Sequence, residues 1–255
     1  MLIILAVILV VGCSLLSAAL TFIVRKFSLH TGFVAHPVRD RYHQQVMPLG
    51  GGIAIFATIA AAITVAILIV KFIAAPGYMN WLGESVTIHI EGFLKKIDQL
   101  LILLICTAIL FALGLWDDKK NLGPYFKLIV QFAVAAAVVS FADIRVEFFI
   151  HSKLVTSVLS AVWIVLIINV FNFLDNMDGA SAGIAVIVTC ILFTAAALSG
   201  QVFVGAMTLI FIGALLGFLA FNFPPAKIFM GDCGSLVIGF FIAVLTLRTT
   251  YYHQV

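Results

Sequence analysis

Long stretches of apolar residues without a charged side chain dominate this sequence. The first covers residues 1–24, and the longest uncharged interval lies between Asp178 and Lys227. A helix needs about 20 apolar residues to cross the hydrocarbon core of a bilayer, and its backbone groups must be hydrogen-bonded internally there. The stretches therefore exclude a soluble globular domain and predict an all-α, polytopic integral membrane protein.

The apolar content predicts about eight membrane-spanning helices. Hydrophobic residues make up 64% of the 255-residue chain, and the interval after Asp178 is long enough for two helices, with the polar hinge 199–201 between them. The predicted spans are residues 1–24, 49–70, 100–116, 124–142, 154–174, the two halves of 179–226, and 234–247 or beyond. We expect Lys127, near the start of the fourth span, to extend its ammonium to the interface. The chain is interpreted as one multi-span domain, 1–255.

The charged residues are few, and they indicate an orientation. A net charge of +3 from 14 basic and 11 acidic residues is too small and too scattered for nucleic-acid binding. Arg25 and Lys26 follow the first span, which favours an N-terminus outside and cytoplasmic loops after spans one, three, five and seven.

Five aspartates stand at the predicted cytoplasmic ends of spans. They are Asp117, Asp118, Asp175, Asp178 and Asp232. Aspartate is a common helix cap, so each one taken alone has a structural alternative. Five together on one membrane face, without five matching cations, predict a shared site. Carboxylate oxygens suit Mg²⁺, which commonly shares them with substrate phosphates.

Asparagines extend this pattern at the end of the fifth span. The spacing predicts that Asn169, Asn172, Asp175 and Asn176 lie near one stripe of a helix end. Polar groups there are costly in lipid and should face a cavity or neighbouring helices. The alternative for Asn169 is a hydrogen bond between helices.

Two glycine-containing segments could receive an anion. Gly231 and Gly234 flank Asp232 directly before the last span, which should expose backbone N–H groups at a helix start. The loop 25–48 carries Arg41 and His43, which could bind a phosphate or simply form a positively charged cytoplasmic flank.

Four ordered motifs carry a family resemblance. They are Arg41-x-His43 followed by 48-PLGGGI-53, 117-DDKKNL-122, 169-NVFNFLDNMDG-179 and 229-FMGDCGSL-236. In order and position they resemble the polyprenyl-phosphate N-acetylhexosamine-1-phosphate transferases. The match is closer to the bacterial undecaprenyl-phosphate GlcNAc-1-phosphate transferases than to the phospho-MurNAc-pentapeptide translocases, and covers residues 36–245.

The resemblance implies transfer of N-acetylhexosamine 1-phosphate from a UDP-sugar to polyprenyl phosphate, releasing UMP, with Mg²⁺ or Mn²⁺ required. The implied place is the bacterial cytoplasmic membrane, with membrane lipids around the protein and the active site on the cytoplasmic side. A homodimer is left open. For the chemistry we favour direct attack by the lipid phosphate, already ionised at neutral pH, over a covalent aspartyl intermediate.

The resemblance also implies a role for each motif residue. Asp117 and Asp118 would be catalytic, positioning or deprotonating the polyprenyl phosphate, and Asp232 and Asn172 would hold the metal. The implied substrate-binding residues are Asp175, Asp178, Asn176, His43 and Arg41.

One departure from the family keeps alternatives open. Family members normally continue for further spans and a His-rich cytoplasmic loop, whereas this sequence ends at Val255, so we expect a short or partial form. The alternatives are an inactive lipid-binding relative and a cation- or proton-coupled transporter. Transporters, however, tend to place carboxylates near the bilayer midplane rather than at span ends.

Overall fold

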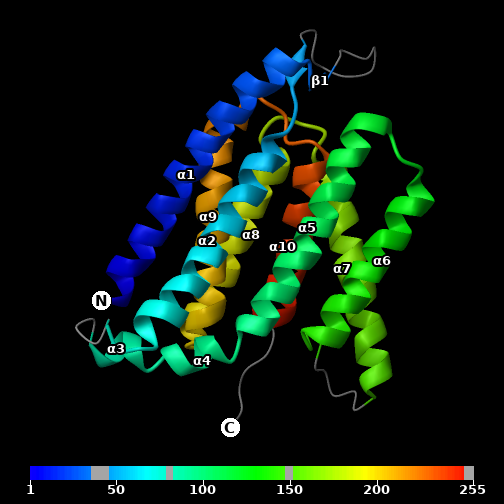
Figure 1. Cartoon of the computed structure of the whole chain (residues 1–255). Helices are drawn as coiled ribbons and strands as arrows, with labels where there is room; N and C mark the ends of the chain where they lie inside the picture. The colour runs from blue at the N-terminus through cyan, green and yellow to red at the C-terminus, as the bar shows by residue number, and fades with distance from the viewer. Residues whose placement is uncertain (36–45, 79–82, 147–151, 250–255) are drawn as a thin grey trace.

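The chain folds as a bundle of long helices. A computed structural model describes residues 1–35, 46–78, 83–146 and 152–249 (Figure 1). Eight helices in these ranges are long and apolar enough to cross a membrane, which confirms the predicted fold class. They are α1 (Leu2–Thr31), α2 (Gly51–Ile69) with its π-helical continuation η1 (Val70–Ala74), α5 (Ile97–Lys120), α6 (Pro124–Phe141), α7 (Lys153–Leu174), α8 (Ala180–Leu198), α9 (Val202–Asn222) and α10 (Asp232–Thr249).

Short elements lie at the two ends of the bundle. Strands β1 (Val34–Ala35) and β2 (Met47–Pro48) pair antiparallel between α1 and α2. At the opposite end, helices α3 (Glu84–Thr87) and α4 (Ile90–Leu94) connect η1 to α5 (Figure 1).

The first helix is longer than predicted. The sequence indicated a span over residues 1–24, but α1 continues to Thr31 and ends at Gly32, whose φ of 72° is left-handed. Helical hydrogen bonding does not stop where the apolar run stops, and glycine adopts this terminating conformation without a steric penalty. The segment predicted as a loop from residue 25 therefore begins inside a helix, and Arg25 Nε donates to the Lys227 carbonyl at 3.1 Å.

Helix α10 is central, whereas α1 is peripheral. In the apolar window of α10, 78% of residues are buried, against 11% in α1. Close packing on α10 depends on glycine. A Cβ at Gly239 would lie 2.6 Å from the α7 backbone at Ile168, and a Cβ at Gly52 of α2 would lie 2.2 Å from the backbone nitrogen of Gly234. These contacts fix the position of the first turn of α10, which contains Asp232.

Candidate active site

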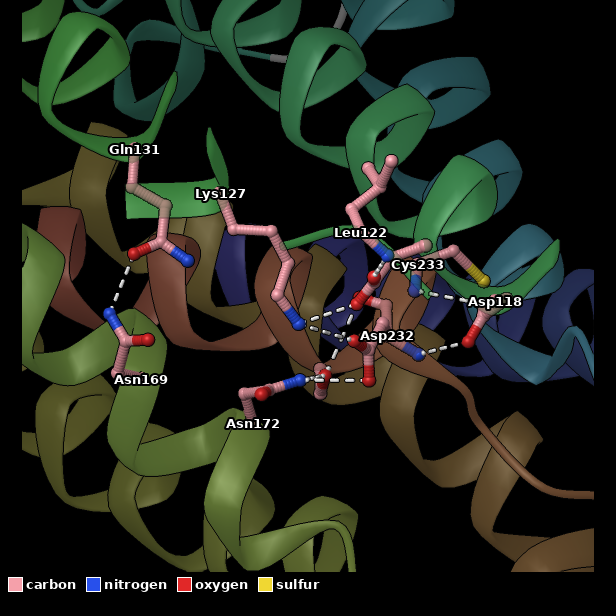
Figure 2. A network of polar contacts seen from close by, with 10 residues as sticks. Asp118, Leu122, Lys127, Gln131, Asn169, Asn172, Asp232 and Cys233 are labelled. Atoms are coloured by element: carbon pink, nitrogen blue, oxygen red, sulfur yellow. Dashed lines mark hydrogen bonds and ion pairs between the residues drawn. The ribbon is translucent and has the colours of Figure 1, made fainter. Parts of the chain in front are cut away.

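The first turn of α10 is capped by a side chain from another helix. Asp118, near the end of α5, accepts hydrogen bonds from the backbone N–H groups of Asp232 at 2.8 Å and Cys233 at 3.2 Å (Figure 2). Gly231, with φ 78°, makes this approach possible, because a Cβ there would lie 2.7 Å from a carboxylate oxygen of Asp118. The helix start predicted to be open to an anion is therefore occupied by Asp118.

Lys127 lies between two carboxylates. Its Nζ is 2.5 Å from Asp117 Oδ2 and 3.3 Å from Asp232 Oδ2 (Figure 2). The ammonium of Lys127, in the first turn of α6, is thus directed to a buried and a half-buried carboxylate on two other helices. That it reaches the membrane interface stays a prediction.

Asp117 is held rigidly. Only 5% of the residue is exposed, and its second oxygen, Oδ1, accepts from the Leu122 backbone N–H at 2.6 Å. Asn121, between them, adopts a left-handed conformation with φ 47°, which turns the chain back at the end of α5. Asp117 therefore joins the α5–α6 turn to the ammonium of Lys127.

Asn172 connects α7 to the same centre. Its Nδ2 donates to Asp232 Oδ1 at 3.0 Å and to Ser235 Oγ at 2.9 Å. Because the side-chain nitrogen makes both bonds, the amide oxygen of Asn172 is left for another partner. The structure thus brings together Asp117, Asp118, Asn172 and Asp232 with Lys127, a group that we call the polar cluster.

A second polar pair lies one turn farther along the helices. Asn169 Nδ2 donates to Gln131 Oε1 at 2.6 Å, joining α7 to α6, and Gln131 is 2% exposed (Figure 2). This is the interhelical hydrogen bond that the sequence offered as the alternative for Asn169. Lys127 and Gln131 are four residues apart on α6, so one helix face presents both.

The segment after Asn172 does not continue the predicted stripe. Helix α7 ends at Leu174, so Asp175 and Asn176 lie in the turn that follows and the four-residue stripe is wrong for them. Aspartate and asparagine hydrogen-bond to the nearby backbone and so favour turns, as Asn176 Nδ2 does by donating to Phe173 O at 2.5 Å. Gly179, with φ 68°, then begins α8.

The predicted residue Asp178 and the unpredicted Asn222 organise loops beside the polar cluster. Asp178 accepts from the Ala226 backbone N–H at 3.0 Å, which ties the α7–α8 turn to the segment before α10. The neighbouring Asn222 bonds to the Gly179 N–H and the Ile228 carbonyl, each at 3.0 Å. Arg41 and His43 lie outside the described residues.

Sequence reasoning missed three contributors to this centre: Lys127, Gln131 and Ser235. The four-residue spacing of Lys127 and Gln131 in an otherwise apolar span was a detectable signal, because polar residues repeated on one helix face seek a buried partner. Ser235 had no comparable signal, since serine at a helix start ordinarily caps its own helix.

The donor chemistry of the cluster fits a divalent cation only in part. Among residues 1–35, 46–78, 83–146 and 152–249, no group of three or more His, Cys, Asp or Glu side chains is arranged around one point as a metal site. Mg²⁺, however, is commonly held by one or two carboxylates, with waters and phosphates completing its shell. Asp232 and the amide oxygen of Asn172 meet that smaller requirement.

Several known proteins are similar in sequence to this chain. The chain is 31% identical over 240 residues to a probable undecaprenyl-phosphate N-acetylglucosaminyl 1-phosphate transferase of Bacillus subtilis, covering 91% of this chain and 60% of that protein. It is 28% identical over 234 residues to a decaprenyl-phosphate N-acetylglucosaminephosphotransferase of Mycolicibacterium smegmatis, covering 85% and 53%. A phospho-N-acetylmuramoyl-pentapeptide-transferase of Clostridium botulinum is 32% identical over 188 residues, covering 67% and 58%. The chain thus spans between half and two thirds of the length of these relatives.

A family model matches the part of the chain that contains the polar cluster. The model of glycosyl transferase family 4 matches residues 100–250, which include α5, α6, α7 and α10. The family resemblance inferred from the four motifs is confirmed by this match and by the relatives. The chain belongs to glycosyl transferase family 4.

Proposed function

We propose that the protein transfers N-acetylglucosamine 1-phosphate from a UDP-sugar to a polyprenyl phosphate. The observation that carries the proposal is the polar cluster itself: three aspartates, an asparagine and a lysine meet at one end of an otherwise apolar bundle. The names of the relatives supply the substrate class. A site at a bundle end can receive a water-soluble nucleotide while a prenyl chain stays in lipid.

The chemistry needs alignment and charge balance. A phosphate oxygen of the lipid attacks the phosphorus that carries the sugar, the bond to UMP breaks, and UMP leaves with the electron pair. The attacking phosphate is ionised at neutral pH, so no residue has to form a covalent intermediate. Phosphoryl transfer depends mainly on positioning and on stabilising the charge on the phosphoryl oxygens.

The residues of the cluster divide these tasks. Mg²⁺, held by Asp232 and the amide oxygen of Asn172, would neutralise diphosphate charge when bound. Lys127 offers a positive charge to the incoming phosphates and is itself oriented by Asp117. Asp118 acts through the backbone, because its bonds to the first turn of α10 fix the position of Asp232.

The remaining predicted residues stay proposals at the edge of the site. Asp175, Asp178 and Asn176 lie in the turn beside the cluster, where a nucleotide or sugar would enter. Arg41 and His43 belong to the segment between β1 and β2, elements that lie at the same end of the bundle as α10's first turn (Figure 1). We propose phosphate contacts for both.

We also propose that this end faces the cytoplasm of a bacterial cell and that the N-terminus lies outside. Arg25 and Lys26 flank the cluster end of α1, and Lys119 and Lys120 end α5 there, in agreement with the excess of basic residues in cytoplasmic loops. A Lys120→Cys variant without Cys190 tests this. Labelling by an impermeant maleimide in intact cells would contradict the proposed orientation.

The activity is tested by following radiolabel from UDP-GlcNAc into chloroform-soluble lipid in membranes that contain the chain and Mg²⁺. Asp232→Ala should reduce transfer at least about 100-fold, because it removes a group that acts on transition-state charge. Asp98→Ala is the matched control, an exposed aspartate in the first turn of α5 at the other end of the bundle. Absence of transfer by the unmutated chain would overturn the proposal and favour an inactive relative.

A further inference from the structure

A cavity of about 530 Å³ opens at the end of the bundle opposite the polar cluster. It lies where α5 and α9 begin and α10 ends, beside the short helix α4 (Figure 1). These are ends of membrane-spanning helices, so the cavity lies at the depth of lipid headgroups. None of the groups assigned above to the transferase reaction lines it.

Lysine and arginine contribute three side chains to the cavity lining, and one histidine, His89, lies among them. The three are Lys96, Arg145 and Arg248. Among the lining residues that the structure describes, the one acid is Asp143, which pairs with Arg145 at 3.2 Å while remaining 67% exposed. These three cations thus outnumber the described acid of the lining, so the electrostatic potential of the described lining favours an anion.

Within the described part of the chain, neither Lys96 nor Arg248 forms an ion pair closer than 4 Å, although the Asp143 carboxylate attracts Arg248 from a longer distance. Arg248 donates from Nη2 to the neutral Gln99 side chain, and the Lys96 ammonium lies 5.9 Å from the centre of the Phe203 ring. Burial, together with the nearby Arg248 cation, lowers the pKa of Lys96. Holding two like charges at a half-buried site without an anion is costly, and an anionic ligand would remove that cost.

The other walls of the cavity are apolar. Phe93 of α4 and Val202 and Phe203 of α9 contribute side chains to it. A small apolar crevice of about 20 Å³ lies beside it between α5, α9 and α10, and the two spaces share Phe203, Val204 and Arg248. The crevice is too small for an acyl chain, so the apolar walls of the larger cavity itself would have to receive one. A basic lining beside these apolar walls suits a molecule with an anionic head and a hydrocarbon tail.

We propose that this cavity binds the phosphate headgroup of an anionic phospholipid, with Lys96, Arg145 and Arg248 on the phosphate and the first part of an acyl chain against Phe203. A phosphate at headgroup depth is the anion that a membrane supplies in quantity. Charge-assisted hydrogen bonds from lysine and arginine to phosphate are among the strong ones. The site is independent of the transferase reaction.

The binding is tested by titrating the purified full chain in neutral detergent with short-chain phosphatidylglycerol and with phosphatidylcholine of the same acyl length. We expect saturable binding of phosphatidylglycerol and at least about tenfold weaker binding of phosphatidylcholine. Lys96→Gln should weaken phosphatidylglycerol binding about tenfold. The Lys96 side chain makes no described hydrogen bond, and its backbone hydrogen bonds are kept in the variant. Lys71→Gln is the control, an exposed cation at the same end of the bundle, outside the cavity lining.

Two results would overturn the proposal. Equal affinity of Lys96→Gln and the unmutated chain for phosphatidylglycerol would show that the lipid binds elsewhere. Inorganic phosphate binding as tightly as phosphatidylglycerol would show that the apolar walls contribute nothing and that the ligand is a free anion. Arg145→Gln is a second variant of the cavity lining and should also weaken phosphatidylglycerol binding. It is preferred to Arg248→Gln, which would lose the hydrogen bond to Gln99 and could fail to fold for that reason.

Discussion

The two ends of α10 are surrounded by side chains of opposite charge. Around its first turn, Asp117 and Asp232 share the ammonium of Lys127, and Asp118 accepts from the backbone N–H groups of α10. Around its last turn, among the described residues that line the cavity, Lys96, Arg145 and Arg248 face one exposed acid, Asp143. At the first end the charges are joined by short hydrogen bonds, whereas at the second they face an open cavity. We therefore expect the hydrogen-bonded charges at the first end, the closed end, to stabilise the folded chain. The charges at the second end, the open end, should be neutralised only when a ligand binds in the cavity.

The largest loss of stability is expected from removing the ammonium of Lys127 at the first end of α10. Lys127→Met leaves the buried Asp117 carboxylate without its cation, and we expect a loss on the order of 3 kcal/mol in the free energy of unfolding. Thermal unfolding in detergent measures the effect. Adding Asp117→Asn to the same chain should recover part of it, because the uncompensated charge is then absent.

The exposed Lys120 at the end of α5 provides the control for this experiment. Lys120→Met should leave the unfolding temperature nearly unchanged. A Lys127→Met protein as stable as the original would mean that the ammonium contributes no net stability at the first end of α10.

The backbone contact beside the cluster is tested by Gly114→Ala. A Cβ at this position of α5 would lie 2.5 Å from the carbonyl oxygen of Asp232, and both helix backbones would have to shift. Overpacking of this kind costs about 1–3 kcal/mol. Gly12→Ala, where no atom lies within 4 Å of the new Cβ, should be neutral or slightly stabilising in the same unfolding assay, because alanine has the higher helix propensity. Equal effects of the two substitutions would contradict the close approach of α5 and α10.

A smaller effect is expected for the polar pair below the cluster. Gln131→Leu removes the acceptor for Asn169 and should cost about 1 kcal/mol, in the range of hydrogen bonds between membrane helices. A double-mutant cycle with Asn169→Leu isolates the interaction from the change in side-chain volume. A coupling energy indistinguishable from zero would show that α6 and α7 do not depend on this bond.

The second end of α10 should give the smallest effect on folding. Arg145→Gln breaks an ion pair with an acid that is 67% exposed, and solvent screening limits the expected loss to about 0.5 kcal/mol. Unfolding in neutral detergent measures it. If Arg145→Gln lowered the free energy of unfolding as much as Lys127→Met does, the charges at the two ends of α10 would contribute equally to stability, contrary to the comparison.

The membrane fold was predictable because a long uncharged apolar run is unfavourable in water and can cross lipid only as a helix. Local limits were less predictable: α1 runs past its apolar segment to Thr31, and α7 stops at Leu174 before the expected stripe is complete. In both cases the end of the helix is set by the turn or capping residue that follows it. Counting apolar residues does not show whether such a residue continues the helix or bonds to the backbone of a turn.

The membership of the polar cluster was partly predictable. Asp117, Asp118, Asn172 and Asp232 stand in motifs at span ends, and the structure brings them together. The particular partners of Lys127 were not predictable, because its spacing with Gln131 indicated a buried partner without showing which carboxylates on other helices would supply it. Nor was the helix cap that Asp118 supplies to α10, 114 residues away along the chain.

The burial of α10 has a consequence for how the protein is made. Of the eight apolar helices in the described ranges, α10 has the lowest mean hydropathy and the largest buried share. Because of its low hydropathy, α10 gains less than the other helices from moving into lipid. Its stability in the membrane depends more on close packing at glycine against α2, α5 and α7. The ribosome synthesises α10 after all three of these helices. Its insertion is therefore expected to be a docking step into partners already in the membrane, so damage to the α2, α5 or α7 contact faces should lower the yield of inserted protein.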